Sequence, residues 1–251
     1  MDLLPSYRAA RNALVERLRV ELGADRRFAA AWLYGSLGRG DGDDLSDIDL
    51  ALVVEDDAAA ALCARPWEMG GQTTPERLRL FCQFGEPILI HENHQYAKAG
   101  GSFSFVRYRE AGVMVDWSLR PREDAARAAD TLLLFDKIGI PLLPEQGGGP
   151  PARDEFKIAE RAAFFWMMAG ITAKYLLRGD TAFVLPWLVK LVDIVEEVEW
   201  LDQFEPASGS IPAPGESQAR TLRGLCARAA ACAPVDAAVR AQIEGWIDLA
   251  G

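Results

Sequence analysis

The feature that most constrains the fold is a Pro/Gly-rich segment that divides the 251-residue chain into two parts of different pattern. Residues 141–152 read PLLPEQGGGPPA, which concentrates turn-forming residues and has little to bury. Before this segment, short apolar runs end in turn residues; after it, apolar residues recur at helical spacing over long stretches. The pattern predicts a domain with strands at residues 1–140, a linker at 141–152 and a helical domain at 153–251.

Helix and strand signals are mixed in the first part. Leu14, Leu18 and Leu22 recur at helical spacing and Gly23 follows as a stop, which predicts an amphipathic helix. Short apolar runs that end in turn residues predict buried strands. The predicted elements are a helix at 7–22 and strands at 28–34, 48–54, 87–91, 103–108 and 113–119. We expect the last two strands to form a hairpin, because only a short turn separates them.

Long apolar-periodic stretches in the second part predict a helical bundle. The predicted helices are 154–178, 182–201 and, after a Pro/Gly/Ser loop, two weaker ones at 217–231 and 236–249. The apolar run 164–168 covers too much of one helix to be a ligand-binding stripe, so we interpret it as the buried face of that helix. The expected fold class is therefore α+β followed by an all-α helical bundle.

Charge and composition narrow the possible partners. The chain has 27 basic and 37 acidic residues and a net charge of −10. Without a basic stripe or interleaved aromatic residues, nucleic acid is disfavoured as a partner. The acidic balance suits a cationic substrate, although solubility is the simpler explanation of it.

Targeting signals and cysteine pairs are also lacking. No apolar run is long enough to span a membrane and the N-terminus lacks a signal-peptide pattern, so we expect a cytoplasmic protein with no membrane partner. Four scattered cysteines form no C-x-x-C pair, which disfavours a zinc knuckle or a disulfide framework. A monomer and a homodimer both remain open.

Residues 34–50, which read YGSLGRGDGDDLSDIDL, concentrate the chemistry. Gly35 comes directly after a predicted strand and permits the backbone geometry and close approach that a phosphate requires. Ser36 can open a helix whose free N–H groups attract anions. A Gly-Ser pair alone is more often an ordinary strand-to-helix turn, so its meaning depends on the residues that come after it.

Asp47 and Asp49 come about a dozen residues later, where the next predicted strand begins. Residues two apart on a strand project from the same face, so we expect both carboxylates together while Ile48 and Leu50 point into the core. Two like charges this close are costly without a cation between them, and hard oxygen ligands favour Mg²⁺ or Mn²⁺. The strand, the Gly-Ser turn and the D-x-D pattern together predict a triphosphate and metal site.

The motif resembles the signature of the DNA polymerase β-like nucleotidyltransferase superfamily, with GS at 35–36, RG at 39–40 and SDIDL at 46–50. The resemblance implies a small mixed sheet flanked by helices and two divalent metal ions. It also implies attack by a substrate hydroxyl on the α-phosphate of a nucleoside triphosphate, with pyrophosphate as the leaving group.

Such a displacement needs a third carboxylate near the attacking hydroxyl. Asp116 lies in the apolar segment GVMVDWS, where an unpaired carboxylate is costly, and the superfamily carries its third acid on such a strand. We therefore predict Asp116 as the third catalytic and metal-binding acid beside Asp47 and Asp49. The alternative is an ion pair with a nearby arginine, which would be Arg107, Arg109 or Arg120. Weaker candidates for the general base are Glu86, Glu92 and Glu110.

Arg39 and the two histidines have less specific interpretations. Arg39 either binds the phosphates or pairs with the acidic run 41–44. His91 and His94 have a spacing that metal ligands use, but no other histidine exists and no cysteine lies nearby, so a zinc site is not favoured. We interpret both as ordinary loop residues.

The order of a catalytic domain and then a helical domain is similar to the antibiotic adenylyltransferases of this superfamily, which inactivate aminoglycosides or lincosamides. The resemblance implies AMP transfer from ATP and a helical domain that contributes to nucleotide and substrate binding. It makes Lys174, at the end of the first helix of that domain, a candidate for nucleotide binding. Candidates for contact with a polycationic substrate are Glu86, Glu196, Glu199 and Trp200, with a solvated helix face as the alternative for the last three.

Three functions remain open. The first, favoured by the acidic balance, is an aminoglycoside O-adenylyltransferase. The second is nucleotidyl transfer to a lincosamide, another small hydroxyl compound or a protein side chain. The third is a non-enzymatic, antitoxin-like nucleotidyltransferase domain fused to a helical partner, against which the intact Gly-Ser pair and both aspartates count.

Overall fold

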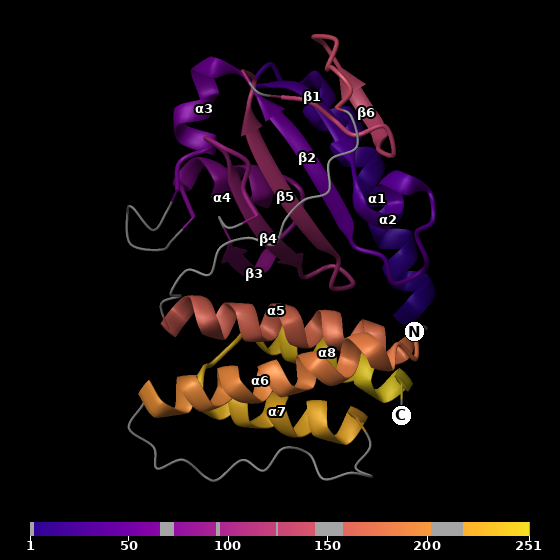
Figure 1. Cartoon of the computed structure of the whole chain (residues 1–251), viewed down its shortest axis with the longest axis vertical. Helices are drawn as coiled ribbons and strands as arrows, with labels where there is room; N and C mark the ends of the chain where they lie inside the picture. The colour runs from indigo at the N-terminus through magenta and orange to yellow at the C-terminus, as the bar shows by residue number, and fades with distance from the viewer. Residues whose placement is uncertain are drawn as a thin grey trace. The chain divides into compact units, whose positions relative to one another are not determined.

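The computed structural model describes residues 3–65, 73–93, 96–123, 125–143, 158–201 and 218–250. The chain divides into two compact units, Met1–Glu155 and Phe156–Gly251. The first unit contains the sheet and the second contains helices (Figure 1). Most of the expected linker 141–152 lies outside the described residues. No helix in the described part of the chain is long and apolar enough to cross a membrane.

A six-stranded mixed sheet forms the centre of the first unit, in the order β3-β4-β5-β2-β1-β6. Strands β2 and β5 are parallel and lie side by side in Figure 1, whereas each other neighbouring pair is antiparallel. The strands are β1 (Phe28–Leu33), β2 (Ile48–Val54), β3 (Pro87–Glu92), β4 (Ser102–Tyr108), β5 (Met114–Pro121) and β6 (Leu132–Asp136).

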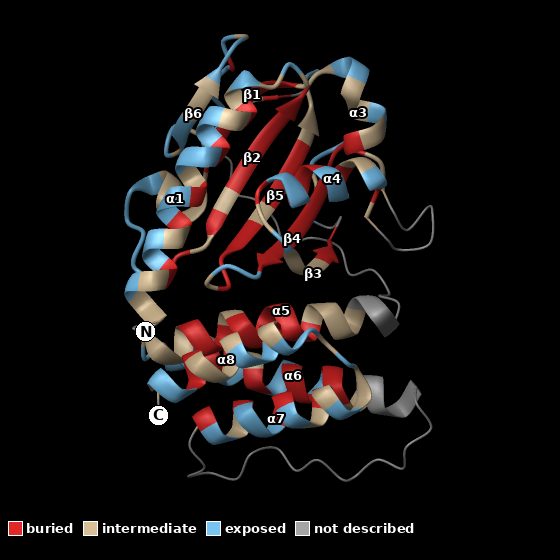
Figure 2. Ribbon diagram, turned by 180° about the vertical axis from the view of Figure 1, so that it is seen from behind, coloured by how far each residue is buried: buried red, intermediate tan, exposed pale blue. Residues whose placement is uncertain are grey.

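Helices cover one face of this sheet. The helices of the unit are α1 (Leu3–Ala24), α2 (Gly35–Arg39), α3 (Asp56–Leu62) and α4 (Pro75–Gln83). Figure 2 shows α1, α3 and α4 on the same side of the strands. Phe81 and Phe84 pack their rings against Trp117 of β5, with centroids 5.3 and 5.7 Å apart. The odd-numbered residues of β5 therefore face these helices.

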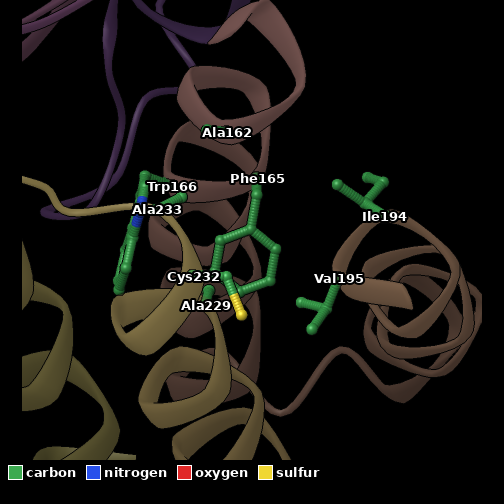
Figure 3. Close-up of a pocket in the computed structure, with 8 residues that line it drawn as sticks. All are labelled: Ala162, Phe165, Trp166, Ile194, Val195, Ala229, Cys232 and Ala233. Carbon is green, nitrogen blue, oxygen red and sulfur yellow. The ribbon is translucent and has the colours of Figure 1, made fainter. Parts of the chain in front are cut away.

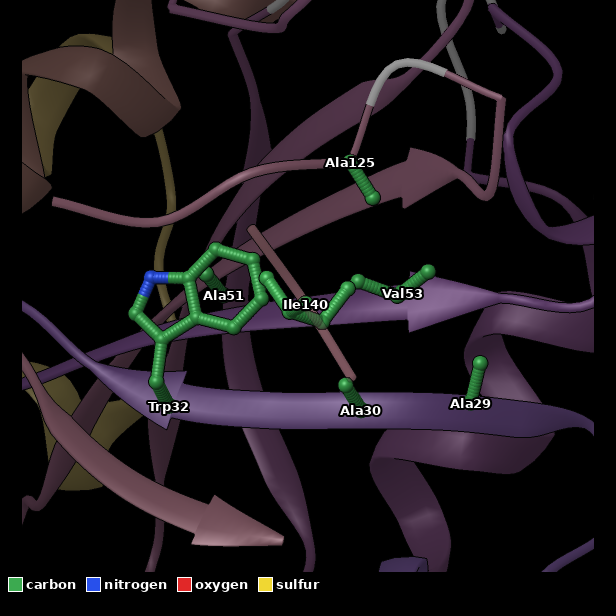
Figure 4. Close-up of a cluster of buried hydrophobic side chains, with 7 residues drawn as sticks. All are labelled: Ala29, Ala30, Trp32, Ala51, Val53, Ala125 and Ile140. Atoms are coloured by element: carbon green, nitrogen blue, oxygen red, sulfur yellow. The ribbon is translucent and has the colours of Figure 1, made fainter. Parts of the chain in front are cut away.

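The opposite face of the sheet carries a second apolar cluster. Trp32 of β1 and its cross-strand neighbour Ala51 of β2 belong to it. Ala125 and Ile140, which come from loops and not from helices, complete the cover (Figure 4). On this face the guanidinium of Arg120 lies 5.0 Å above the Trp32 ring. The even-numbered residues of β5 therefore share a face with Trp32.

The second unit contains four helices in its described part. They are α5 (Ile158–Leu177), α6 (Thr181–Leu201), α7 (Gln218–Cys232) and α8 (Ala237–Ala250). Helix α5 packs against the other three. Phe165, Trp166, Met167 and Met168 are buried, as predicted, whereas Phe164 of the same run is only half-buried. A small apolar cavity of about 10 Å³ remains between α5, α6 and α7 (Figure 3). That volume is at the lower limit for one water molecule, so the cavity is no substrate site.

The α+β class is confirmed, and so are the five predicted strands, each within two residues of its expected ends. The predicted hairpin is β4–β5, and the first helix is longer than expected. Strand β6 and helices α3 and α4 were not predicted. The interpretation of His91 as a loop residue was wrong, because it lies buried inside β3. His94 lies outside the described residues.

Candidate functional site

Gly35 forms the turn between β1 and α2 and lies directly against the side chain of Asp49. Its φ of 61° is in the left-handed region, which glycine adopts without strain. The N–H of Tyr34 donates to the carbonyl of Asp49 over 3.0 Å and joins the end of β1 to the start of β2. A Cβ at Gly35 would lie 2.7 Å from Cγ of Asp49, which is too close. The carboxylate of Asp49 therefore needs a glycine at this position.

Asp49 and Asp116 are direct neighbours on the parallel strands β2 and β5. The two residues are register partners, and both side chains are half-buried. Their strands lie about 4.8 Å apart, so directly paired side chains project from the same face beside each other. The helices α1, α3 and α4 cover the other face, where Trp117 lies. Two carboxylates side by side repel each other unless a cation lies between them.

Tyr34 lies close to this acidic pair. Burial raises the pKa of its phenol well above the usual value, and the charges of Asp116 and Asp49 raise it further. Arg120 acts in the opposite direction. The ring of Tyr34 packs against the apolar cluster around Trp32, so the phenol remains on the same face as the two carboxylates.

Asp47 precedes β2 and is held from α1. The hydroxyl of Tyr7 donates a hydrogen bond of 2.7 Å to Oδ1 of Asp47 and a longer one of 3.4 Å to the carbonyl of Ser46. The charge of Asp47 also acts on Arg107 of β4. Burial lowers the pKa of Arg107, and the charges of Asp47 and Tyr7 oppose that shift. Asp47 therefore lies just before the start of β2, where it accepts a hydrogen bond from a buried phenol and its charge acts on a buried guanidinium.

The loop between α2 and β2 is held by its own side chains. Ser36 donates through Oγ to Oγ of Ser46 over 3.0 Å, and Ser46 donates to Oδ1 of Asp43 over 2.9 Å. Helix α2 begins at Gly35 and has only five residues, so Ser36 lies within it and does not cap it. Arg39 forms an exposed ion pair with Asp41, with Nε and Oδ2 3.1 Å apart. Of the two predicted roles of Arg39, this structure contains the pairing with the acidic run.

Two of the other acids have partners away from the pair Asp49–Asp116. Glu86 forms an exposed ion pair of 2.7 Å with Arg109. Glu92 forms a buried ion pair of 3.1 Å with Arg77 and accepts a hydrogen bond from Ser104. Ser104 is the register partner of Trp117, so this network lies on the helix-covered face. Glu92 is therefore unsuitable as a general base beside Asp116.

The carboxylates provide the oxygen ligands that Mg²⁺ and Mn²⁺ prefer, and that of Asp49 occupies the space that a side chain at position 35 would fill. Among the described residues, no group of three or more His, Cys, Asp or Glu side chains is arranged to hold a metal ion. The acids that are paired in register are Asp49 and Asp116, while Asp47 is oriented toward Tyr7. Asp49 and Asp116 can therefore offer two carboxylates to a divalent ion, whereas Asp47, in the orientation that it has beside Tyr7, does not complete a group of three.

The predicted residues of the second unit lie on α5 and α6. Lys174 is in the last turn of α5 and is buried. Glu196 of α6 is half-buried. The side chains of Glu199 and Trp200 lie outside the described residues.

Sequence reasoning missed Tyr7 and Arg107 as neighbours of Asp47. Tyr7 shares the buried helix face of Leu14 and Leu18, so its burial is readable from the periodicity, but its acidic partner is not. No protein-family model matches the chain, and comparison with curated proteins gives no match.

Proposed function

We propose that this chain is a metal-dependent nucleotidyltransferase with a polymerase β-like catalytic unit, which transfers a nucleoside monophosphate from a nucleoside triphosphate to a hydroxyl group of a small molecule. One observation carries the proposal. Asp49 and Asp116 are paired in register on parallel strands, and Asp49 lies against the bare backbone of Gly35. The adjacent acids and the glycine turn come from three separate segments, which makes a coincidental surface cluster a poor explanation.

In the proposed in-line displacement, each residue of the site has a different role. When bound, Mg²⁺ or Mn²⁺ ions supply positive charge that stabilises the attacking and leaving oxygens. Asp49 and Asp116, with Asp47 before β2, would hold these ions. Gly35 lets the chain approach the phosphates closely, because no side chain intervenes. Asp116 has a strand position that is fixed on both sides by β2 and β4, which suits an acid that must orient an acceptor hydroxyl.

The proposed acceptor is an aminoglycoside, and ATP is the proposed donor of the nucleotide. A net charge of −10 favours a polycationic acceptor over an anionic one, because the field of the protein concentrates cations. A lincosamide, another small hydroxyl compound and a protein side chain are the alternative acceptors, and each would use the same acidic pair.

The test measures pyrophosphate release from each nucleoside triphosphate with Mg²⁺ and a panel of aminoglycosides and lincosamides. We expect release with one drug class and a loss on the order of 100-fold or more in Asp49→Asn and Asp116→Asn. Asp57→Asn is the matched control, because it removes an exposed carboxylate from α3 in the same unit. Triphosphate binding without release across the whole panel would favour the non-enzymatic alternative. Equal release from all four proteins would refute the assigned site.

A further inference from the structure

The strand register extends the row of the two acids toward the β3 edge of the sheet. Asp49 is the register partner of Asp116, which is in turn the partner of Phe105 on β4. Phe105 is the partner of His91 on β3, and the rings of these two residues are stacked with centroids 5.9 Å apart. Directly paired residues project from the same face, so both rings lie on the face of the acids, opposite the helices α1, α3 and α4 (Figure 2). The row therefore changes from acidic to aromatic directly after Asp116.

Phe103, Phe105 and Tyr96 form an aromatic cluster on this face. Phe103 and Phe105 are buried and lie edge to face, with centroids 5.0 Å apart. The ring of Tyr96 packs against both, at 5.5 Å from Phe103 and 6.2 Å from Phe105. The N–H of Tyr96 donates to the carbonyl of Asn93 over 3.2 Å, just after the end of β3. Tyr96 itself is 52% exposed, so two buried rings hold a third ring whose surface is open to contact.

The aromatic cluster and the Gly35 turn lie on opposite sides of Asp116. Gly35 follows β1, and the strand order β4-β5-β2-β1 places β5, which carries Asp116, between that turn and β4 (Figure 1). In an in-line displacement the attacking and leaving oxygens lie on opposite sides of the phosphorus. A triphosphate at the Gly35 turn therefore places the acceptor hydroxyl near Asp116 and the rest of the acceptor toward β4.

The chemistry of the aromatic cluster suits a cationic ring compound. The face of an aromatic ring carries negative potential and attracts an ammonium group within about 6 Å of the ring centroid. The net charge of −10 acts in the same direction. Arg107 lies on the same face of β4, but Tyr96 contacts Phe103 and Phe105 and therefore lies toward the other end of the strand.

We infer that Tyr96 is a specificity-determining residue that binds an ammonium-bearing ring of the acceptor, while Phe103 and Phe105 hold its ring in place. The inference rests on the proposed function, because it assigns the acceptor of that reaction to the β4 side of Asp116. Tyr96 acts on the acceptor and not on the transferred phosphate. Its loss should therefore weaken acceptor binding without slowing the chemical step.

The experiment measures pyrophosphate release with Mg²⁺, each of ATP, GTP, CTP and UTP, and kanamycin, neomycin or gentamicin as the acceptor. Tyr96→Leu removes the aromatic face but keeps an apolar side chain, whereas Tyr96→Phe keeps the face. Leu78→Ala is the matched control, because it removes a side chain that is 41% exposed from α4, which covers the other face of the sheet. We expect Tyr96→Leu to raise the KM for the acceptor about 3- to 30-fold, the range of a cation–π contact. Both kcat and the KM for the triphosphate should stay within about 2-fold of the wild type.

Tyr96→Phe and Leu78→Ala should keep the acceptor KM of the wild type, a pattern that a merely structural role of Tyr96 would not produce. An unchanged acceptor KM in Tyr96→Leu, in a protein whose pyrophosphate release is lost in Asp49→Asn, would overturn this inference alone. Release with a lincosamide but with none of the three aminoglycosides would do the same. A wild type that releases no pyrophosphate with any acceptor would overturn the proposed function and this inference with it.

Discussion

Replacing Gly35 by alanine should disturb the site through a displacement that can be worked out from the structure. At a φ of 61° an alanine costs about 1–2 kcal/mol in the backbone. The added Cβ would lie 2.7 Å from Cγ of Asp49. Ordinary carbon contacts need about 3.5 Å, so the carboxylate must withdraw by roughly 1 Å. A misplacement of about 1 Å at a reacting centre costs on the order of 100-fold in rate.

The matched control for this prediction is Gly40→Ala. Gly40 has a φ of 79°, so an alanine meets similar backbone strain, but no atom of the described residues lies within 4 Å of the added Cβ. Urea unfolding should therefore show a loss of about 1–3 kcal/mol in both variants. Pyrophosphate release should fall about 100-fold only in Gly35→Ala. A full rate in Gly35→Ala, or an equal loss of rate in both variants, would refute the argument that Gly35 sets the position of Asp49.

Three further predictions concern other residues. Asp116→Asn should keep the circular dichroism spectrum and reduce pyrophosphate release on the order of 100-fold or more, because it removes half of the paired acids. Arg77→Met should lower the free energy of unfolding in urea by about 3–5 kcal/mol, since it leaves the carboxylate of Glu92 buried without its cation; a loss below about 1 kcal/mol would contradict this. Burial lowers the pKa of His91 to about 4, below the value of about 6.5 expected in the unfolded chain. The unfolded chain therefore binds the proton first as the pH falls, and up to about 3 kcal/mol of stability should be lost between pH 6.5 and 4. Urea unfolding at pH 7 and pH 5 should show this loss in the wild type and a smaller one in His91→Leu.

The strands that were predicted well are those that consist of a run of apolar residues with polar or turn residues at its ends. Strand β2 was predicted at its observed bounds, Ile48–Val54, because an apolar run ends there at acidic residues. Strand β6, Leu132–Asp136, was missed because it is a partly exposed edge strand that depends on its pairing with β1, about a hundred residues earlier in the chain. Helix α4 had a readable start in Thr74, Pro75 and Glu76, where the threonine caps the helix as expected. The sequence therefore contained enough information to predict the start of α4.

Only the part of the candidate site that depends on local sequence could be predicted. The spacing of Gly35 and Asp49 reflects local chain geometry, since the turn after β1 and the strand β2 lie close together in sequence. Asp116 is different, because nothing in a single sequence states which strand lies beside β2. The hydrogen bond from Tyr7 to Asp47 joins residues 40 positions apart and depends on how α1 crosses the sheet. Such contacts come from tertiary packing, which periodicity cannot specify.

The pairing of β2 with β5 connects the hydrophobic core to the geometry of the site. A parallel pair needs a long crossover, and here the chain passes through α3, α4, β3 and β4 before β5 returns beside β2. A shift of one residue in this register would turn Asp116 toward the helices and Trp117 away from them. Trp117 is fully buried against Phe81 and Phe84, so that shift would cost the burial of its ring. The packing of Trp117 on one face of the sheet therefore holds Asp116 opposite Asp49 on the other.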